Sequence, residues 1–153
     1  MASDNNWSAP AVQVLVVEDF EPFRLFLRSA LGKHSGLQIV GEASDGLESV
    51  RKAEELQPDI ILLDIGLPTL NGMEAARRIR TLSPESKIIF VTQESGPDIV
   101  EGALNLGACG YVVKIQATTV LLTALDAVLD GRHFVSGGLT GPDLTQAQTA
   151  ISY

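Results

Sequence analysis

The chain has 153 residues, of which 45% are hydrophobic and 20% are charged, and its formal net charge is −8 with a pI near 4.6. This length and composition predict one domain with a hydrophobic core and exclude wholesale disorder. The negative charge disfavours direct contact with DNA or an anionic membrane. The first ten residues lack the features of a signal peptide, and no apolar run approaches the ~20 residues of a membrane span.

Short, β-branched apolar segments recur along the chain after a polar start. Residues 1–10 are predicted to be a disordered leader, and residues 11–135 a folded domain. We expect strands over Val12–Val17, Leu37–Val40, Ile60–Leu63, Lys87–Val91 and Gly110–Val113. Continuous apolar runs of this length are typical of buried parallel strands. A single cysteine, Cys109, rules out an intrachain disulfide.

Segments with helical periodicity separate these strands. Asp45 with Glu48, and Asn71 with Glu74, have the spacing of capping boxes that open the second and third helices. Pro97 fits the first turn of a fourth helix. Alternation of strands and helices predicts an α/β fold, a doubly wound parallel sheet of five strands with five helices on its two faces. Residues 136–153 are rich in Gly, Ser, Thr and Gln, and we expect a linker or tail there.

Polar residues follow the apolar strands where each strand ends. These residues are Glu18, Asp19, Asp64, Thr92 and Lys114. In an open parallel sheet the carboxyl ends of the strands form the ligand-binding edge. Three carboxylates brought together there would repel one another, and a hard divalent cation such as Mg²⁺ would relieve that repulsion.

The same residues suit phosphoryl transfer. An aspartate can act as a nucleophile and form an aspartyl phosphate. A metal ion together with the Lys114 ammonium would stabilise the charge on the phosphoryl oxygens, and the Thr92 hydroxyl can donate a hydrogen bond to one of them. The cluster therefore predicts a phosphorylation site.

Four motifs in their strand contexts resemble the receiver domain of bacterial response regulators. They are VLVVED at 14–19, DIILLDIGLPTLNGMEAARRIR at 59–80, KIIFVTQ at 87–93 and GACGYVVK at 107–114. The resemblance implies the flavodoxin-like receiver fold with strand order 2-1-3-4-5. It also implies that the chain takes a phosphoryl group from a sensor histidine kinase and switches conformation to control an effector.

The resemblance also assigns roles to individual residues. It implies that Asp64 is the phospho-acceptor and that Glu18, Asp19, Asp64 and the backbone carbonyl of Gly66 hold Mg²⁺. Thr92 and Lys114 then contact the phosphoryl group. Thr92 and Tyr111 would be the switch residues. Pro68 and Gly72 match the loop after the acceptor strand.

The subfamily that the motifs most resemble often carries a C-terminal helix-turn-helix. Contact with DNA is therefore expected only through an effector domain absent from this chain, in a cytoplasmic protein with no membrane partner. The fifth helix is apolar beyond one stripe, at Val120, Leu122 and Ala127, which suggests a homodimer through the face of the fourth and fifth helices.

Two positions depart from the family pattern. Gln93 follows Thr92 where the family usually has a small residue, and Ile115 follows Lys114 where many members have proline. We predict that Gln93 prolongs the phosphorylated state. Three alternatives stay open: a phosphorylation-independent interaction module, a metal-dependent phosphohydrolase and a nucleotide or flavin binder. The last two are disfavoured because Ile65 and Gly66 supply no acid or base and because no glycine-rich phosphate loop follows the first strand.

Overall fold

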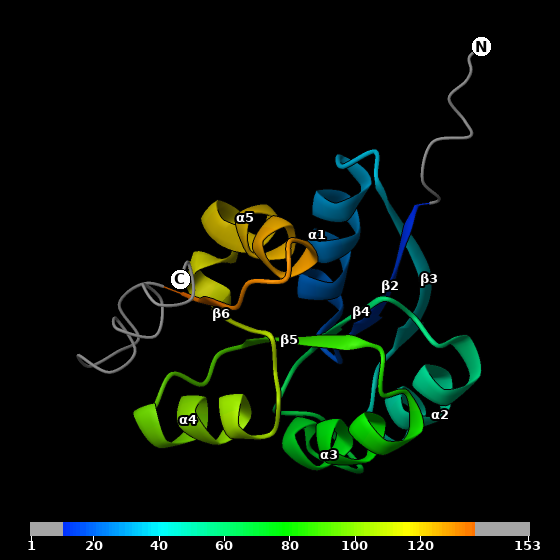
Figure 1. The fold of residues 1–153 in the computed structure, drawn as a ribbon, viewed down its shortest axis with the longest axis vertical. Helices are drawn as coiled ribbons and strands as arrows, with labels where there is room; N and C mark the ends of the chain where they lie inside the picture. The colour runs from blue at the N-terminus through cyan, green and yellow to red at the C-terminus, as the bar shows by residue number, and fades with distance from the viewer. Residues whose placement is uncertain (1–10, 137–153) are drawn as a thin grey trace.

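A parallel sheet of six strands forms the centre of the molecule (Figure 1). The computed structural model describes residues 11–136. The strands are β2 (Val12–Val17), β3 (Leu37–Ala43), β4 (Ile60–Leu63), β5 (Lys87–Thr92), β6 (Gly110–Val113) and β7 (Phe134–Val135). Their order in the sheet is β3-β2-β4-β5-β6-β7, and all neighbouring pairs are parallel. The first five strands have the predicted order 2-1-3-4-5, and β7 is an addition at the edge.

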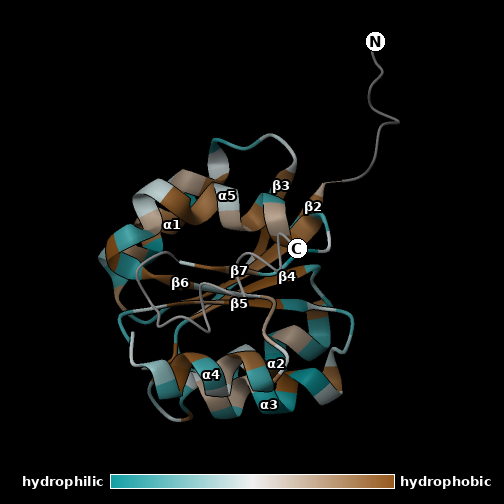
Figure 2. Ribbon diagram, turned by 60° about the vertical axis from the view of Figure 1, so that its left-hand side comes forward, coloured by the Kyte–Doolittle hydropathy of each residue, from teal (hydrophilic) through white to brown (hydrophobic). Residues whose placement is uncertain are grey.

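Within residues 11–136, five α-helices cover the two faces of the sheet. They are α1 (Glu21–Gly32), α2 (Gly46–Leu56), α3 (Gly72–Leu82), α4 (Pro97–Asn105) and α5 (Ala117–Leu129), and a short 3-10 helix, η1 (Lys114–Gln116), precedes α5. Helices α1 and α5 lie on one face, and α2, α3 and α4 on the other (Figure 1). Hydrophobic strands lie between helices that are more polar on the outside (Figure 2). The predicted doubly wound architecture is therefore confirmed.

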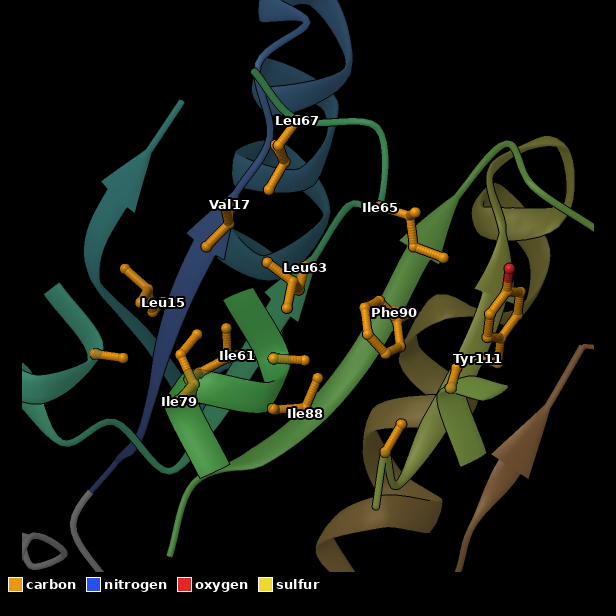
Figure 3. Close-up of a cluster of buried hydrophobic side chains, with 14 of the residues drawn as sticks. Leu15, Val17, Ile61, Leu63, Ile65, Leu67, Ile79, Ile88, Phe90 and Tyr111 are labelled. Atoms are coloured by element: carbon orange, nitrogen blue, oxygen red, sulfur yellow. The ribbon is translucent and has the colours of Figure 1, made fainter. Parts of the chain in front are cut away.

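Successive side chains of each strand point to opposite faces of the sheet, which gives the molecule two core layers. In β2, Leu15 and Val17 join the layer under α2, α3 and α4, whereas Val14 and Val16 join the layer under α1 and α5. Figure 3 shows the first layer, with Phe90 and Tyr111 side by side on β5 and β6. The four residues of β4 are completely buried, as expected for the central strand of a sheet covered on both faces.

The predicted helix starts are correct, although the capping boxes are incomplete. The side chain of Asp45 accepts a hydrogen bond from the Glu48 amide at 2.8 Å, and Asn71 accepts one from the Glu74 amide at 3.0 Å. The Glu48 carboxylate accepts from the amide of Ser44 rather than from that of Asp45. In each helix the cap therefore satisfies one amide of the first turn, which would otherwise have no partner.

Several boundaries differ from those predicted. Strand β3 extends to Ala43, and β5 includes Thr92. The side chain of Ala127 is buried, so it cannot contribute to an exposed face, while Val120 and Leu122 are half-buried and pack against the layer under α1 and α5. The predicted leader, residues 1–10, and residues 137–153 of the predicted tail lie outside the described residues. None of the helices between residues 11 and 136 has the length and apolar character needed to cross a bilayer.

Candidate functional site

Four parallel strands bring the predicted site residues to one edge of the sheet. Val17 of β2 pairs with Leu63 of β4, Leu63 pairs with Phe90 of β5, and Thr92 pairs with Val113 of β6. The residues that end these strands are Glu18, Asp64, Thr92 and Lys114. They come together because parallel strands in register end at the same side, as expected for the ligand-binding edge of an open α/β sheet.

Three carboxylates form a compact cluster at this edge. Oxygen atoms of Glu18, Asp19 and Asp64 all lie within 4.8 Å of one another. Glu18 is 1% exposed and Asp64 is 5% exposed, whereas Asp19 is open to solvent. Two of the three negative charges are therefore held inside the protein, where water cannot screen them well.

The ammonium group of Lys114 bridges the two buried carboxylates. Its Nζ atom lies 2.9 Å from Oε1 of Glu18 and 3.1 Å from Oδ2 of Asp64. The same atom lies 4.8 Å from the ring centroid of Phe23 on α1, which is within the range of a cation–π interaction. These contacts fix the end of a long, flexible side chain next to Asp64.

Burial and ion pairing shift the pKa values of Glu18 and Lys114 in opposite directions. Burial raises the pKa of the Glu18 carboxyl, and the hydrogen bond from Lys114 offsets this only in part. For Lys114, burial acts to lower the pKa, but the hydrogen bond to Glu18 and the charges of Asp64 and Glu18 outweigh it, so its pKa is raised. Lys114 is therefore cationic at neutral pH.

Thr92 and Tyr111 contact one segment, the turn that follows β5. The amide of Glu94 donates to Oγ1 of Thr92 at 3.4 Å, and the hydroxyl of Tyr111 donates to the carbonyl oxygen of Glu94 at 2.8 Å. Both side chains are buried. Tyr111 points inward beside Phe90, with ring centroids 6.1 Å apart (Figure 3). Gly66 is exposed after β4, and its amide donates to Oδ1 of Asp64 at 3.4 Å.

Gln93 and Ile115 lie on the outer side of the site. They line an open cavity of about 440 Å³ together with Lys114, the N-cap residue Phe20, and Pro22, Phe23 and Phe26 of α1. Ile115 lies in η1 and is 86% exposed. The peptide bonds of the described residues are all trans, including the one between Lys114 and Ile115.

Two residues of α1 approach the site without having been predicted to do so. Phe23 packs against the core layer under α1 and α5, and its ring also faces Lys114. Arg24 donates from an Nη atom to the backbone carbonyl of Glu18 at 3.0 Å. Neither contact has a local sequence signal, because each depends on how α1 is placed against the ends of the strands.

Comparisons with known proteins agree with this geometry. Residues 14–126 match the model of the response regulator receiver domain. The chain belongs to this family. It is 34% identical over 125 residues to response regulator GacA of Pseudomonas viridiflava, an alignment that covers 82% of this chain and 58% of GacA. It is 32% identical to transcriptional regulatory protein LiaR of Bacillus subtilis, over 88% of this chain and 64% of LiaR.

Solved structures of receiver domains have the same fold. A two-component response regulator of the LuxR family from Aurantimonas superposes with a TM-score of 0.79 at 31% identity, covering 92% of this chain and 96% of that chain. The receiver domain of a NarL-type regulator from Mycobacterium tuberculosis gives a TM-score of 0.76 at 29% identity, over 81% of this chain and all of the other. The receiver domain described here spans roughly three fifths of the length of the curated relatives that it matches.

Proposed function

We propose that this receiver domain accepts a phosphoryl group on Asp64 and uses it as a reversible signal. The observation that carries the proposal is the bridge that Lys114 makes to Asp64 and Glu18 beside Asp19. A nearly buried carboxylate next to a fixed ammonium and two further carboxylates is an unfavourable arrangement for stability alone. It is well suited to a reaction that brings phosphoryl oxygens and a cation to the same place.

The residues present fit a Mg²⁺ ion. The three carboxylates, when ionised, and the Lys114 ammonium that bridges two of them have a net charge of −2, which a divalent cation would neutralise. All donors are hard oxygen atoms, the type that Mg²⁺ prefers. We propose Glu18, Asp19, Asp64 and the carbonyl of Gly66 as its protein ligands. When bound, Mg²⁺ would draw charge from the phosphoryl oxygens.

The protein's own groups position the reacting atoms. An oxygen of Asp64 forms the new bond to phosphorus, the bond from phosphorus to the donor group breaks, and the departing group keeps that electron pair. Lys114 is held next to Asp64, so its positive charge stands where negative charge collects on the phosphoryl group. The hydroxyl of Thr92, from the neighbouring strand, can turn to donate to a phosphoryl oxygen.

Thr92 and Tyr111 also provide a route by which phosphorylation can change the surface at α4. Both contact the backbone of Glu94, which lies between β5 and α4. If Thr92 turns toward a phosphoryl group, it gives up the bond to the Glu94 amide and the turn is free to change. We propose that Tyr111 follows this change and that the α4 face presents the signal.

The partners follow from the same assignment. We propose that this chain is cytoplasmic and that a sensor histidine kinase donates the phosphoryl group. We also propose that residues 11–135 form the receiver and residues 136–153 a linker or tail. Self-association through α4 and α5 would be one output. Sedimentation of the domain with and without beryllofluoride tests this output, and a monomer in both states would contradict it. The variant Val120→Asp with Leu122→Asp should not self-associate, and its thermal unfolding must show that it still folds.

The test of the phospho-acceptor is intact-mass spectrometry after incubation with Mg²⁺ and acetyl phosphate. Wild type should gain one phosphoryl group, and the gain should disappear with EDTA and in Asp64→Asn. Asp98→Asn, which changes an exposed aspartate in the first turn of α4, is the matched control and should be phosphorylated like wild type. Equal phosphorylation of Asp64→Asn would show that another residue is the acceptor.

A further inference from the structure

The peptide bond that joins Glu18 to Asp19 is held from outside its own loop. Arg24, one turn into α1, donates to the Glu18 carbonyl oxygen at 3.0 Å. This carbonyl belongs to the same peptide plane as the amide nitrogen of Asp19, because the peptide unit is planar. Arg24 therefore fixes the orientation of the backbone from which the Asp19 side chain extends.

The position of the Asp19 carboxylate depends on the backbone more than the positions of the other two carboxylates do. Glu18 is held by Lys114 and by the amide of Phe20, and Asp64 is held by Lys114. Within residues 11–136, the Asp19 carboxylate makes no hydrogen bond or ion pair. Its position in the cluster is therefore determined by the direction of the Glu18–Asp19 peptide and by side-chain rotation alone.

A second contact holds Arg24 itself. Its Nε atom lies 3.3 Å from Oε1 of Glu42 on β3. Glu42 is fixed in turn by Arg28, whose guanidinium donates to both carboxylate oxygens at 2.8 and 2.9 Å. Arg24 is the better protected arginine, with 20% of its side chain exposed against 53% for Arg28. The guanidinium of Arg24 thus joins β3 to the loop that carries Glu18 and Asp19.

We propose that Arg24 is a positioning residue for the metal-binding carboxylates. Through the Glu18 carbonyl it holds Asp19 in the orientation that closes the cluster, so the cation meets a site that is already formed. The proposal rests on the proposed metal-dependent phosphorylation and adds to it a residue that touches neither metal nor phosphoryl group. Outer contacts of this kind typically change metal affinity by about 10- to 100-fold.

The two arginines provide a matched comparison. Arg24→Met and Arg28→Met each remove one guanidinium from the same helix and the same carboxylate, Glu42, but only Arg24 contacts the Glu18 carbonyl. The affinity for Mn²⁺, measured on the purified chain from the loss of the free-ion signal in electron paramagnetic resonance, needs no phosphorylation. We expect Arg24→Met to bind Mn²⁺ about tenfold more weakly and Arg28→Met to bind it like wild type.

The Mg²⁺ dependence of the rate of phosphorylation by acetyl phosphate should distinguish a positioning role of Arg24 from a direct role in the reaction. Arg24→Met should need more Mg²⁺ for its half-maximal rate, while its rate at saturating Mg²⁺ should stay within about twofold of wild type. Lysine at position 24 retains one cationic donor nitrogen, so Arg24→Lys should recover part of the affinity for Mn²⁺. If Arg24→Met does not fold, the comparison of Arg24→Lys with Arg28→Lys tests the same proposal. Weaker Mn²⁺ binding is then expected only for Arg24→Lys.

Two results would overturn the proposal. One is equal Mn²⁺ affinity of wild type and Arg24→Met, and the other is an equal loss in the Arg24 and Arg28 variants, which would make the effect one of the Glu42 ion pairs in general. Failure of the proposed function looks different, because wild type itself would then bind no Mn²⁺ or would not be phosphorylated on Asp64.

Discussion

Gly72 lies directly against the backbone of Asp64: a Cβ atom at Gly72 would come to 2.0 Å from the Asp64 carbonyl oxygen. The amide of Gly72 also donates to the carbonyl of Ile65 at 2.7 Å. The start of α3 is thus held against the end of β4, and the absence of a side chain permits the approach. This contact helps to fix where the carboxylate of Asp64 stands.

The substitution Gly72→Ala should therefore be costly. It forces the backbone of α3 or of Asp64 to move, and overpacking against backbone should lower the free energy of unfolding by about 3 kcal/mol, the upper end of the usual range. Urea unfolding measures this loss. Gly32→Ala at the end of α1 is the control, since a Cβ there would meet nothing within 4 Å. A Gly72→Ala protein as stable as Gly32→Ala would show that the contact is not a constraint.

The carboxyl of Glu18 should make stability depend on pH in a particular direction. Burial raises its pKa above the ordinary value of 4.5, so the folded protein keeps a proton that the unfolded chain has released. The stabilisation is fully present below about pH 4.5 and is lost as pH rises through the folded pKa. In EDTA, the free energy of unfolding of wild type minus that of Glu18→Gln should therefore fall as pH rises from 4.5.

Glu42 provides a control of opposite sign. Its hydrogen bond with Arg28 holds its pKa below the ordinary value of 4.5, so its stabilisation is present above that pH and is lost as pH falls through the folded pKa. The free energy of unfolding of wild type minus that of Glu42→Gln should thus fall as the pH is lowered. Identical pH profiles for the two differences would contradict the assigned effect of burial on Glu18.

Gln93 should prolong the phosphorylated state. It follows Thr92 directly and lines the open cavity next to Lys114, so its long side chain can hinder a water molecule that approaches the phosphoryl group. Gln93→Ala should lose the phosphoryl group faster, by roughly two- to tenfold, as followed by intact-mass spectrometry after the donor is removed. Ser95→Ala, in the same turn, should behave like wild type. An unchanged or slower rate in Gln93→Ala would show that crowding at this position is not limiting.

Phe23 should stabilise the position of Lys114. Replacing Phe23 by leucine removes the aromatic face that lies 4.8 Å from the ammonium, and a double-mutant cycle with Lys114→Met should give a coupling energy of about 0.5–1 kcal/mol in urea unfolding. Phe26, whose ring is 5.2 Å from that of Phe23, is the matched position. A cycle with Phe26→Leu should give a coupling near zero, and equal couplings would exclude a specific contact with Phe23.

Ser136, which directly follows the short strand β7, should contribute to the stability of the domain. The hydroxyl of Ser136, which is fully buried, accepts from the Val113 amide at 3.1 Å, and the amide of Ser136 donates to the Tyr111 carbonyl. In Ser136→Ala the buried Val113 amide loses its partner, which should cost about 1–3 kcal/mol. An exposed serine changed in the same way, Ser29→Ala in α1, should change the free energy of unfolding by less than about 0.5 kcal/mol. Equal stability of the two variants would show that the hydroxyl of Ser136 does not contribute to stability.

The sequence alone determined the architecture, and it predicted which residues gather at one edge of the sheet. Five apolar strands separated by amphipathic helices permit few arrangements other than a doubly wound sheet. The residues that end those strands must then meet at one edge, so Glu18, Asp19, Asp64, Thr92 and Lys114 could be assigned before any coordinates. The predictions of strands and helix starts were confirmed because strand and helix periodicity and helix caps are local properties of a chain.

Tertiary structure decided the contacts between segments that are far apart in sequence. The bridge from Lys114 to Glu18 spans 96 residues, and the positions of Phe23 and Arg24 depend on the packing of α1 against the sheet. Strand β7 is two residues long, too short for a pattern, and it forms because the edge of β6 offers backbone groups that need partners. The burial of Ala127 likewise depends on packing, since a helix that is apolar on several sides does not reveal which side meets the core.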